Sequence, residues 1–211
     1  MKNIKEALNW RYATKKFDAN KKISEEVFSD LLEVLRLSPS SYGLQPWKFI
    51  VVNNKEIREK IREVAYGQSQ TTDASHLIVF ANKKNIDGNL VDEYMNFISK
   101  EKNIDISSLE GFRNMINGSF AGKSIEELRA WASYQLYLAA GNLLTSCAVS
   151  EIDACPMEGF DRKQLDKLLG LDALNLESKM MVAIGYRSEE DEEAKGKKVR
   201  FPKEEVFIEI N

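Results

Sequence analysis

Apolar residues recur at helical spacing in three segments of the chain. Ser24 is followed by two acidic residues, and apolar side chains then recur three to four positions apart as far as Leu35. A shorter segment with the same spacing runs near Glu56 to Ala65. The third begins with Ser124-Ile-Glu-Glu, a capping-box sequence, and continues to about Val149. The pattern predicts a helix in each segment.

The third of these helices becomes apolar on nearly all sides after Leu136. A helix on a protein surface keeps a polar face, so this half is expected to be buried on most sides, either in a core or against another subunit.

Short apolar runs predict the strands. Trp47–Val52, His76–Phe80 and Met180–Ile184 fit buried central strands, because they contain few polar residues and are rich in β-branched or bulky ones. Glu205–Ile210 has charged residues around apolar ones and predicts a terminal strand that pairs with a sheet edge, its own or a partner's. Long helices around a few separated strands indicate an α+β or three-layer mixed fold, and without repeats or linkers the whole chain, 1–211, is expected to form one domain.

Composition narrows the class of protein. The 211 residues are 43% hydrophobic and 30% charged, which is ordinary for a folded domain, and the net charge of -3 argues against a general grip on nucleic acid. Two cysteines suit a reducing cytosol better than a disulfide framework. The stretch Leu136–Val149 is too short to span a bilayer, and Met1–Trp10 lacks a secretory signal pattern. We therefore expect a cytoplasmic protein with neither membrane nor nucleic-acid partner.

Familiar catalytic motifs are missing or imperfect. Gly118–Ser124 has only three residues between its glycines, whereas a phosphate-binding P-loop needs four, so it is interpreted as a loop that ends at a helix N-cap. The single histidine, His76, and the cysteines Cys147 and Cys155 form no zinc-ligand pattern, and we expect no metal. Neither G-x-G-x-x-G nor G-x-S-x-G occurs. So small a set of catalytic side chains points to a binding protein or to an enzyme whose cofactor does the chemistry.

Three polar segments could together hold a ligand. Arg11–Asp18 contains three cations, Ser38–Trp47 is dense in hydroxyls and backbone donors, and the acidic run Glu189–Glu193 gives way to basic residues between Lys195 and Arg200. Each alone is interpreted as a solvated loop. Together they suit a phosphorylated, partly aromatic ligand, with cations for the phosphate and hydroxyls and amides for a polyol and a ring edge.

Five short motifs occur along the chain in an order that resembles a known protein family. R-x-x-x-K-x-F-D, S-P-S-S-x-x-x-Q-P-W, D-A-S-H before a strand, P-M-E-G-F-D and a basic K-x-R near the C-terminus follow one another from Ile4 to the final strand. This is similar to the FMN-dependent, oxygen-insensitive NAD(P)H nitroreductases, including their dihydropteridine-reductase-like members. The resemblance implies a three-layer α/β/α fold with a mixed central sheet between long helices, and an intertwined homodimer with FMN at the subunit interface.

The resemblance also assigns flavin contacts. Arg11 with Lys15, and Lys198 with Arg200, match two basic pairs near the FMN phosphate and ring. Glu158 and Gly159 match the residues whose backbone N–H groups face flavin N5 and O4. The turn that the other subunit lends to the ribityl chain and ring corresponds to Ser38, Pro39, Ser40 and Gln45.

The chain departs from the family pattern in three places. Tyr12 and Ala13 stand where many relatives have His or Arg followed by Ser, and Gln68 and Gln70 occupy a region where a lysine at the pyrimidine edge is expected. All four are assigned to the flavin by position. Residues 89–122, with Phe112, correspond to a variable lid that with Tyr42 governs substrate choice, and residues 199–211 to an arm that reaches the partner subunit.

The implied activity is ping-pong, two-electron hydride transfer from NAD(P)H through flavin N5 to nitroaromatics, quinones or similar electron-poor acceptors, with no reacting side chain. The alternatives are a flavin reductase, a dihydropteridine reductase or another reductive enzyme of the same fold, and a non-catalytic flavin-binding protein.

Overall fold

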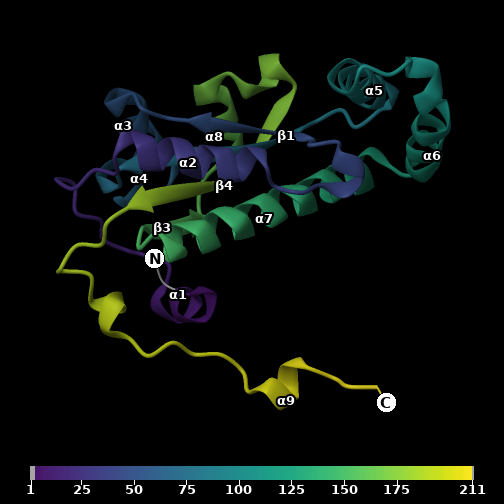
Figure 1. Cartoon of the computed structure of the whole chain (residues 1–211). Coiled ribbons are helices and arrows are strands. Elements are labelled where there is room, and N and C mark those ends of the chain that lie inside the picture. The colour runs from purple at the N-terminus through teal and green to yellow at the C-terminus, as the bar shows by residue number, and fades with distance from the viewer. Residues whose placement is uncertain (1–2, 211) are drawn as a thin grey trace.

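A computed structural model gives the structure of the protein and describes residues 3–210, so the extreme ends of the predicted 1–211 domain lie outside the described residues. Helices and strands alternate along the chain, and the described residues pack into a body with a helical projection at one end and an extended C-terminal tail (Figure 1).

The sheet is built from β1 (Trp47–Val51), β2 (His76–Lys83), β3 (Asp153–Met157) and β4 (Leu176–Gly185). Its strand order is β1-β2-β4-β3, and every neighbouring pair is antiparallel. The sequence predicts a mixed sheet. In the described residues the strands are antiparallel, and the parallel element is an isolated bridge between Ala13 and Ala154 beside β3.

Helices cover both faces of the sheet (Figure 1). On one face lie α2 (Glu25–Arg36) and the long α7 (Ile125–Val149), with α1 (Ile4–Trp10) against α7. On the other face lie α3 (Lys55–Val64) and α8 (Arg162–Leu169).

Alternate residues of the central strand β2 belong to different cores. Ile78 and Phe80 pack with residues of α2 and α7, whereas Leu77 and Val79 pack with residues of α3 and α8. A strand with helices on both faces has no polar side to show, which explains its continuous apolar run. The predicted three-layer α+β architecture is confirmed.

The predicted helices are confirmed as α2, α3 and α7, and the N-caps at Ser24 and Ser124 form as expected. The second half of α7 is only partly buried within one chain. Leu136 and Leu143 are covered, while Tyr137 and Leu138 are 43% and 53% exposed. One face of this helix is therefore open to solvent.

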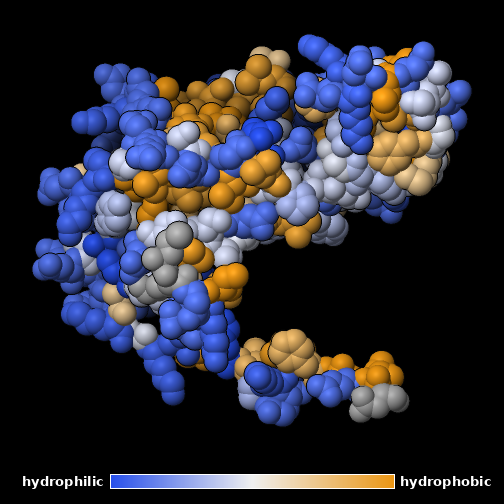
Figure 2. Space-filling view, viewed as in Figure 1, coloured by the Kyte–Doolittle hydropathy of each residue, from blue (hydrophilic) through white to orange (hydrophobic). Residues whose placement is uncertain are grey.

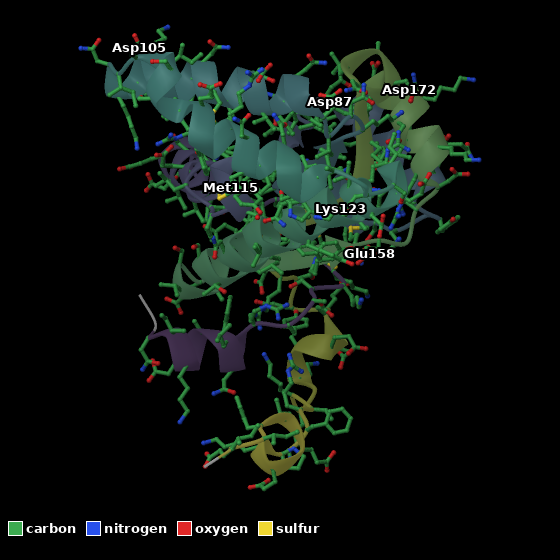
Figure 3. The ribbon with its side chains drawn as sticks, turned by 90° about the vertical axis from the view of Figure 1, so that its right-hand side faces the viewer. Asp87, Asp105, Met115, Lys123, Glu158 and Asp172 are labelled. Atoms are coloured by element: carbon green, nitrogen blue, oxygen red, sulfur yellow. The ribbon has the colours of Figure 1, made fainter. Side chains whose placement is uncertain are left out.

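Residues 88–120 form the helical projection, which contains α5 (Gly88–Lys102), a short helix η2 (Ile106–Leu109) and α6 (Glu110–Phe120). It has a core of its own, which the start of α7 completes. Asp105 marks its outer end in Figure 3. The shorter elements elsewhere are α4 (Gln70–Asp73), η1 (Ser41–Gly43), η3 (Leu171–Leu174), η4 (Glu192–Lys195) and α9 (Lys203–Val206).

The predicted terminal strand 205–210 is wrong for the single chain. Its start belongs to the helical turn α9, and Phe207–Ile210 has no regular structure. Ile208 and Ile210 are 91% and 94% exposed, and the tail stands clear of the body (Figure 2). An isolated strand cannot satisfy its own backbone hydrogen bonds, so the apolar pattern needs a sheet edge from elsewhere before it can form one.

Arg58 holds the segment that leads into β2. Its guanidinium is buried and donates to the carbonyl oxygens of Thr71, Ala74 and Ser75 at 2.5, 2.6 and 3.2 Å. We expect Arg58→Leu to lower the free energy of unfolding by about 3 kcal/mol, because three buried carbonyls lose their donor, as measured by urea denaturation. Arg36→Leu, which removes an exposed guanidinium paired with Glu33, is the control and should change stability very little. Equal losses in both variants would contradict this role for Arg58.

Candidate functional site

Three cations meet where α1 ends and the C-terminal tail passes beneath it. Arg11 is the C-cap residue of α1, and Lys198 and Arg200 belong to the tail. Burial and then the nearby Arg200 lower the pKa of Arg11. Burial and then the charges of Arg11 and Arg200 lower the pKa of Lys198. The second cause of each shift is a like charge held close by, and an anion would relieve that repulsion.

Lys198 also fixes the tail to the body. Its ammonium group donates to the carbonyl oxygens of Leu8 and Arg11, at the C-terminal end of α1. Unpaired carbonyls at a helix C-terminus attract cations, so this contact is favourable without any acidic partner.

Lys15 and Gln70 complete this region around the thiol of Cys155 on β3. Burial raises the pKa of Cys155, while the charge of Lys15, a hydrogen bond with Gln70 and the charge of Arg11 act in the opposite direction. We call Arg11, Lys15, Lys198 and Arg200 the basic cluster. The structure thus brings together both basic pairs from opposite ends of the sequence, with Gln70 beside them.

Tyr12 and Ala13 contact the protein segments around the basic cluster. The Tyr12 hydroxyl donates to the carboxylate of Asp191 at 2.9 Å, and its ring lies under the guanidinium of Arg187 at 4.6 Å from the ring centre. Ala13 forms the bridge to Ala154.

A second group surrounds the end of β3. The Gln68 side-chain amide donates to the carbonyl oxygens of Ala65 and Gly159, at 3.0 and 2.7 Å. Burial and a hydrogen bond to Glu158 raise the pKa of Tyr137 to about 12. Figure 3 shows Glu158 beside α7. The Gln68 side chain thus holds the Glu158–Gly159 corner through the backbone carbonyl of Gly159, and Tyr137 of α7 holds it through the Glu158 side chain.

The turn that follows α2 forms a third group, held by its own polar side chains. Ser38 accepts a hydrogen bond from Asn142 of α7 at 3.1 Å, and the Ser40 hydroxyl accepts the backbone N–H of Gln45 at 3.0 Å. The Gln45 side chain donates to the carbonyl oxygen of Arg36 at 3.0 Å. Pro39, between the two serines, is exposed. The side-chain hydrogen bonds that join this turn to other elements are with α2 and α7.

The lid residues Tyr42 and Phe112 are both half-buried against the core of the 88–120 projection. Tyr42 adopts a left-handed backbone with φ of 57°, and at the adjoining Gly43 a Cβ would lie 2.2 Å from the hydroxyl oxygen of Tyr94. A groove of about 700 Å³ opens beside this turn, between α2, β1 and α5. Gln45, Arg36 and Lys48 are among its lining residues.

Other sequence expectations have clear positions. His76 stacks on Phe28 with ring centres 3.7 Å apart, and its Nδ1 is 3.1 Å from the Ser75 hydroxyl, which is a structural role as expected. Gly118 lies in α6, and the loop after it ends at the N-cap Ser124.

Within residues 3–210, no group of three acidic, His or Cys side chains is arranged to hold a metal ion. No helix in that same part of the chain is both long and apolar enough to cross a bilayer.

Sequence reasoning missed three residues that hold the site together: Asp191, Arg187 and Tyr137. Asp191 is inconspicuous within the acidic run 189–193, and Arg187 follows a strand like an ordinary surface cation. Tyr137 lies in an apolar helix pattern. A signal in the sequence that could have indicated Asp191 is Tyr12, which stands where many relatives have His or Arg and whose hydroxyl needs a hydrogen-bond acceptor.

The chain shares its pattern with known proteins along most of its length. The sequence model of the nitroreductase family matches residues 8–186. A Staphylococcus haemolyticus protein provisionally named an NAD(P)H nitroreductase is 39% identical over 209 residues, which cover 95% of this chain and 94% of that protein. A Bacillus subtilis protein, YfkO, with the same kind of name is 40% identical over 196 residues, covering 87% and 88% of the two chains.

Solved structures share the fold. A provisionally named nitroreductase from Bacillus subtilis, YdfN, superposes with a TM-score of 0.86 at 21% identity, over 98% of each chain. Another, from Exiguobacterium sibiricum and solved in complex with FMN, has a TM-score of 0.83 at 21% identity, over 100% of this chain and 98% of that one.

Both cysteines are inaccessible, which argues against a thiol as the reacting group. Cys147 and Cys155 are 0% and 2% exposed, and burial raises the pKa of Cys147 to about 12. In the native protein at about pH 8 we expect neither thiol to react quickly with Ellman's reagent, and both to react after unfolding in urea. Stoichiometric labelling of the folded protein would contradict this assignment.

Proposed function

The chain belongs to the nitroreductase family, and from that premise we propose that it is an FMN-dependent NAD(P)H oxidoreductase that reduces nitroaromatics, quinones or related electron-poor acceptors. The observation that carries the proposal is the basic cluster, in which burial and then the charge of Arg200 lower the pKa of Arg11, and burial and then the charges of Arg11 and Arg200 lower the pKa of Lys198. A phosphate monoester supplies the missing counter-charge.

The residues of this region suit FMN in chemistry as well as charge. Arg11, Lys198 and Arg200 would bind the phosphate, and Gln70 offers an amide beside them. Lys15 reaches the same region from the segment after α1, where its charge would stabilise the electron-rich edge of a reduced ring. When bound, FMN would supply two-electron hydride chemistry at N5, which this chain's side chains lack.

The Glu158–Gly159 corner would orient the ring through its backbone. Its position is fixed from two sides, by the amide of Gln68 and by the hydroxyl of Tyr137. The Glu158 side chain is paired with Tyr137 and with Arg162, so it is engaged in structure and need not react.

A second copy of the chain would complete the site. The turn Ser38–Gln45 is held by α2 and α7, whereas the basic cluster forms around α1, β3 and the tail. The open face of α7, with Tyr134, Leu138 and the small residue Gly141, offers an apolar surface on which a partner would bury area. We therefore expect a homodimer in which each chain lends this turn to the other's flavin.

The tail has a matching place on such a partner. β1 is an edge strand, and in the groove beside it Arg36 is paired with Glu33 and Lys83 with Glu93, so Lys48 is the cation left for an acidic side chain of a partner. Residues 204–210 carry acidic residues between exposed apolar ones, and so complement the groove in both charge and hydrophobicity. We expect the arm 199–211 to reach the second copy, with residues 205–210 pairing along its β1, where a strand can form.

Closely related activities remain distinguishable. A flavin reductase or a dihydropteridine reductase of this fold would turn over free flavin or quinonoid dihydropterin faster than nitroaromatics or quinones in steady-state assays. A non-catalytic flavin-binding protein would bind FMN and stay oxidised when NADH or NADPH is added anaerobically.

The spectrum of the purified protein tests the proposal. We expect a yellow protein that binds FMN and is bleached by NADH or NADPH under nitrogen, with reoxidation by a nitroaromatic or quinone. Lys15→Ala should lower the stopped-flow rate of bleaching about tenfold, because a cation beside the reduced ring is lost. Lys163→Ala, an exposed lysine on α8, is the control. A colourless protein that FMN does not colour would refute the assignment.

Assembly gives a separate test. Leu138→Asp puts a charge on the open face of α7, and deletion of residues 203–211 removes the tail; each should shift the protein toward monomer in sedimentation velocity and weaken FMN binding. Leu174→Asp changes a leucine that is 63% exposed on η3 and should leave both properties unchanged. A monomeric wild type that retains FMN would contradict the shared site.

A further inference from the structure

A buried carboxylate ties together the two segments that carry the basic cluster. Asp191 is 2% exposed and precedes η4. Its Oδ2 accepts the Tyr12 hydroxyl at 2.9 Å and the backbone N–H groups of Lys15 and Lys16 at 2.8 and 3.0 Å. Its Oδ1 accepts the N–H of Glu193 at 3.2 Å.

These bonds are those of an ionised acid. Burial alone would raise the pKa of Asp191, but the hydrogen bonds from Lys16, Lys15 and Tyr12 outweigh it and hold the pKa below its usual range. The same burial and the bond to Asp191 raise the pKa of Tyr12, which therefore stays protonated and donating.

Tyr12 is fixed from its other side as well. Its ring lies under Arg187, and that guanidinium is paired with the buried carboxylate of Asp153 at 2.5 and 2.8 Å. A continuous series of contacts thus runs from β3 through Arg187 and Tyr12 to Asp191. The Tyr12 hydroxyl hydrogen is engaged by Asp191 and its ring by Arg187, so this hydrogen is not available to donate to a phosphate.

The two tied segments are the ones that hold the cations. Residues 11–15 contain Arg11 and Lys15, and the tail beyond Asp191 contains Lys198 and Arg200. Since like charges repel, the segments would move apart unless something holds them. Asp191 accepts three hydrogen bonds across the two segments and places a negative charge between them, and Lys198 adds its bonds to α1.

We propose that Tyr12 and Asp191 are positioning residues of the phosphate-binding part of the flavin site, where they fix the spacing of Arg11, Lys15 and the tail cations without touching the ligand. The inference rests on the proposed function, and it gives Tyr12 a different role from the direct flavin contact that its position in the sequence suggests.

Two flavins that differ by one phosphate separate this role from a general structural one. Riboflavin has the ring and ribityl chain of FMN but no phosphate, so the ratio of their Kd values reports on the phosphate site alone. The full-length protein, freed of flavin, is titrated with each by fluorescence quenching. Tyr12→Phe keeps the ring under Arg187 and removes only the hydroxyl. It should weaken FMN binding about tenfold and leave riboflavin binding unchanged.

Asp191→Asn should act in the same direction and more strongly, because it also removes the charge. Asp172→Asn changes an exposed carboxylate on η3 that is labelled in Figure 3, and is the matched control. If Asp191→Asn does not fold, as judged by its thermal melt, Tyr12→Phe alone decides.

Equal losses for FMN and riboflavin in Tyr12→Phe would show a general structural role and overturn the inference, as would an unchanged FMN Kd. In both results wild-type binding of FMN leaves the proposed function standing. A wild-type protein that binds neither flavin would overturn the proposed function and this inference with it.

Discussion

Close approach of like charges is the constraint on which the site depends. Arg200 lies near enough to Arg11 and Lys198 for its charge to add to the effect of burial in lowering their pKa values, and such an arrangement of like charges is unfavourable on its own. The fold stabilises it in two ways: helix-end carbonyls accept two hydrogen bonds from Lys198, which has a third N–H, and a buried Asp191 binds backbone N–H groups. Relief of the remaining repulsion would favour the binding of a phosphate.

The layers of the fold could be predicted because their signals are local. His76–Phe80 of β2 and Met180–Ile184 of β4 are apolar runs, and α7 carries its capping box in the sequence. β3 was missed because Pro156 and Asp153 argue against a strand. Pro156 is tolerated since β3 is the edge strand, where an N–H on the outer side has no partner to lose. α8 carried a readable signal, with Asp161 as N-cap and Gly170 in the left-handed conformation after its end, and could have been found.

Only those site residues that occupy motif positions of the family could be predicted from the sequence. These positions located the cations, and the structure brings Arg11 together with Lys198 and Arg200 although 187 residues separate Arg11 from Lys198. They could not identify the residues that hold them, because Asp191 looks like any member of an acidic run until the chain folds. The tail misled for a related reason. Its apolar residues between charged ones are typical of an edge strand, but a strand needs a second chain segment to pair with, and residues 205–210 are only one of the two.

The two edges of the sheet are not equivalent. On the β3 side, Pro156 lacks an N–H, and the backbone N–H of Thr14 already reaches the carbonyl of Ala154 at 3.5 Å, so this border resists a further strand. The β1 side carries no such obstruction at Trp47–Val51. A sheet with a single open edge can accept one additional strand there. In the homodimer proposed above, reciprocal exchange of the C-terminal segments would occupy the free β1 border of both molecules and so end in a closed pair.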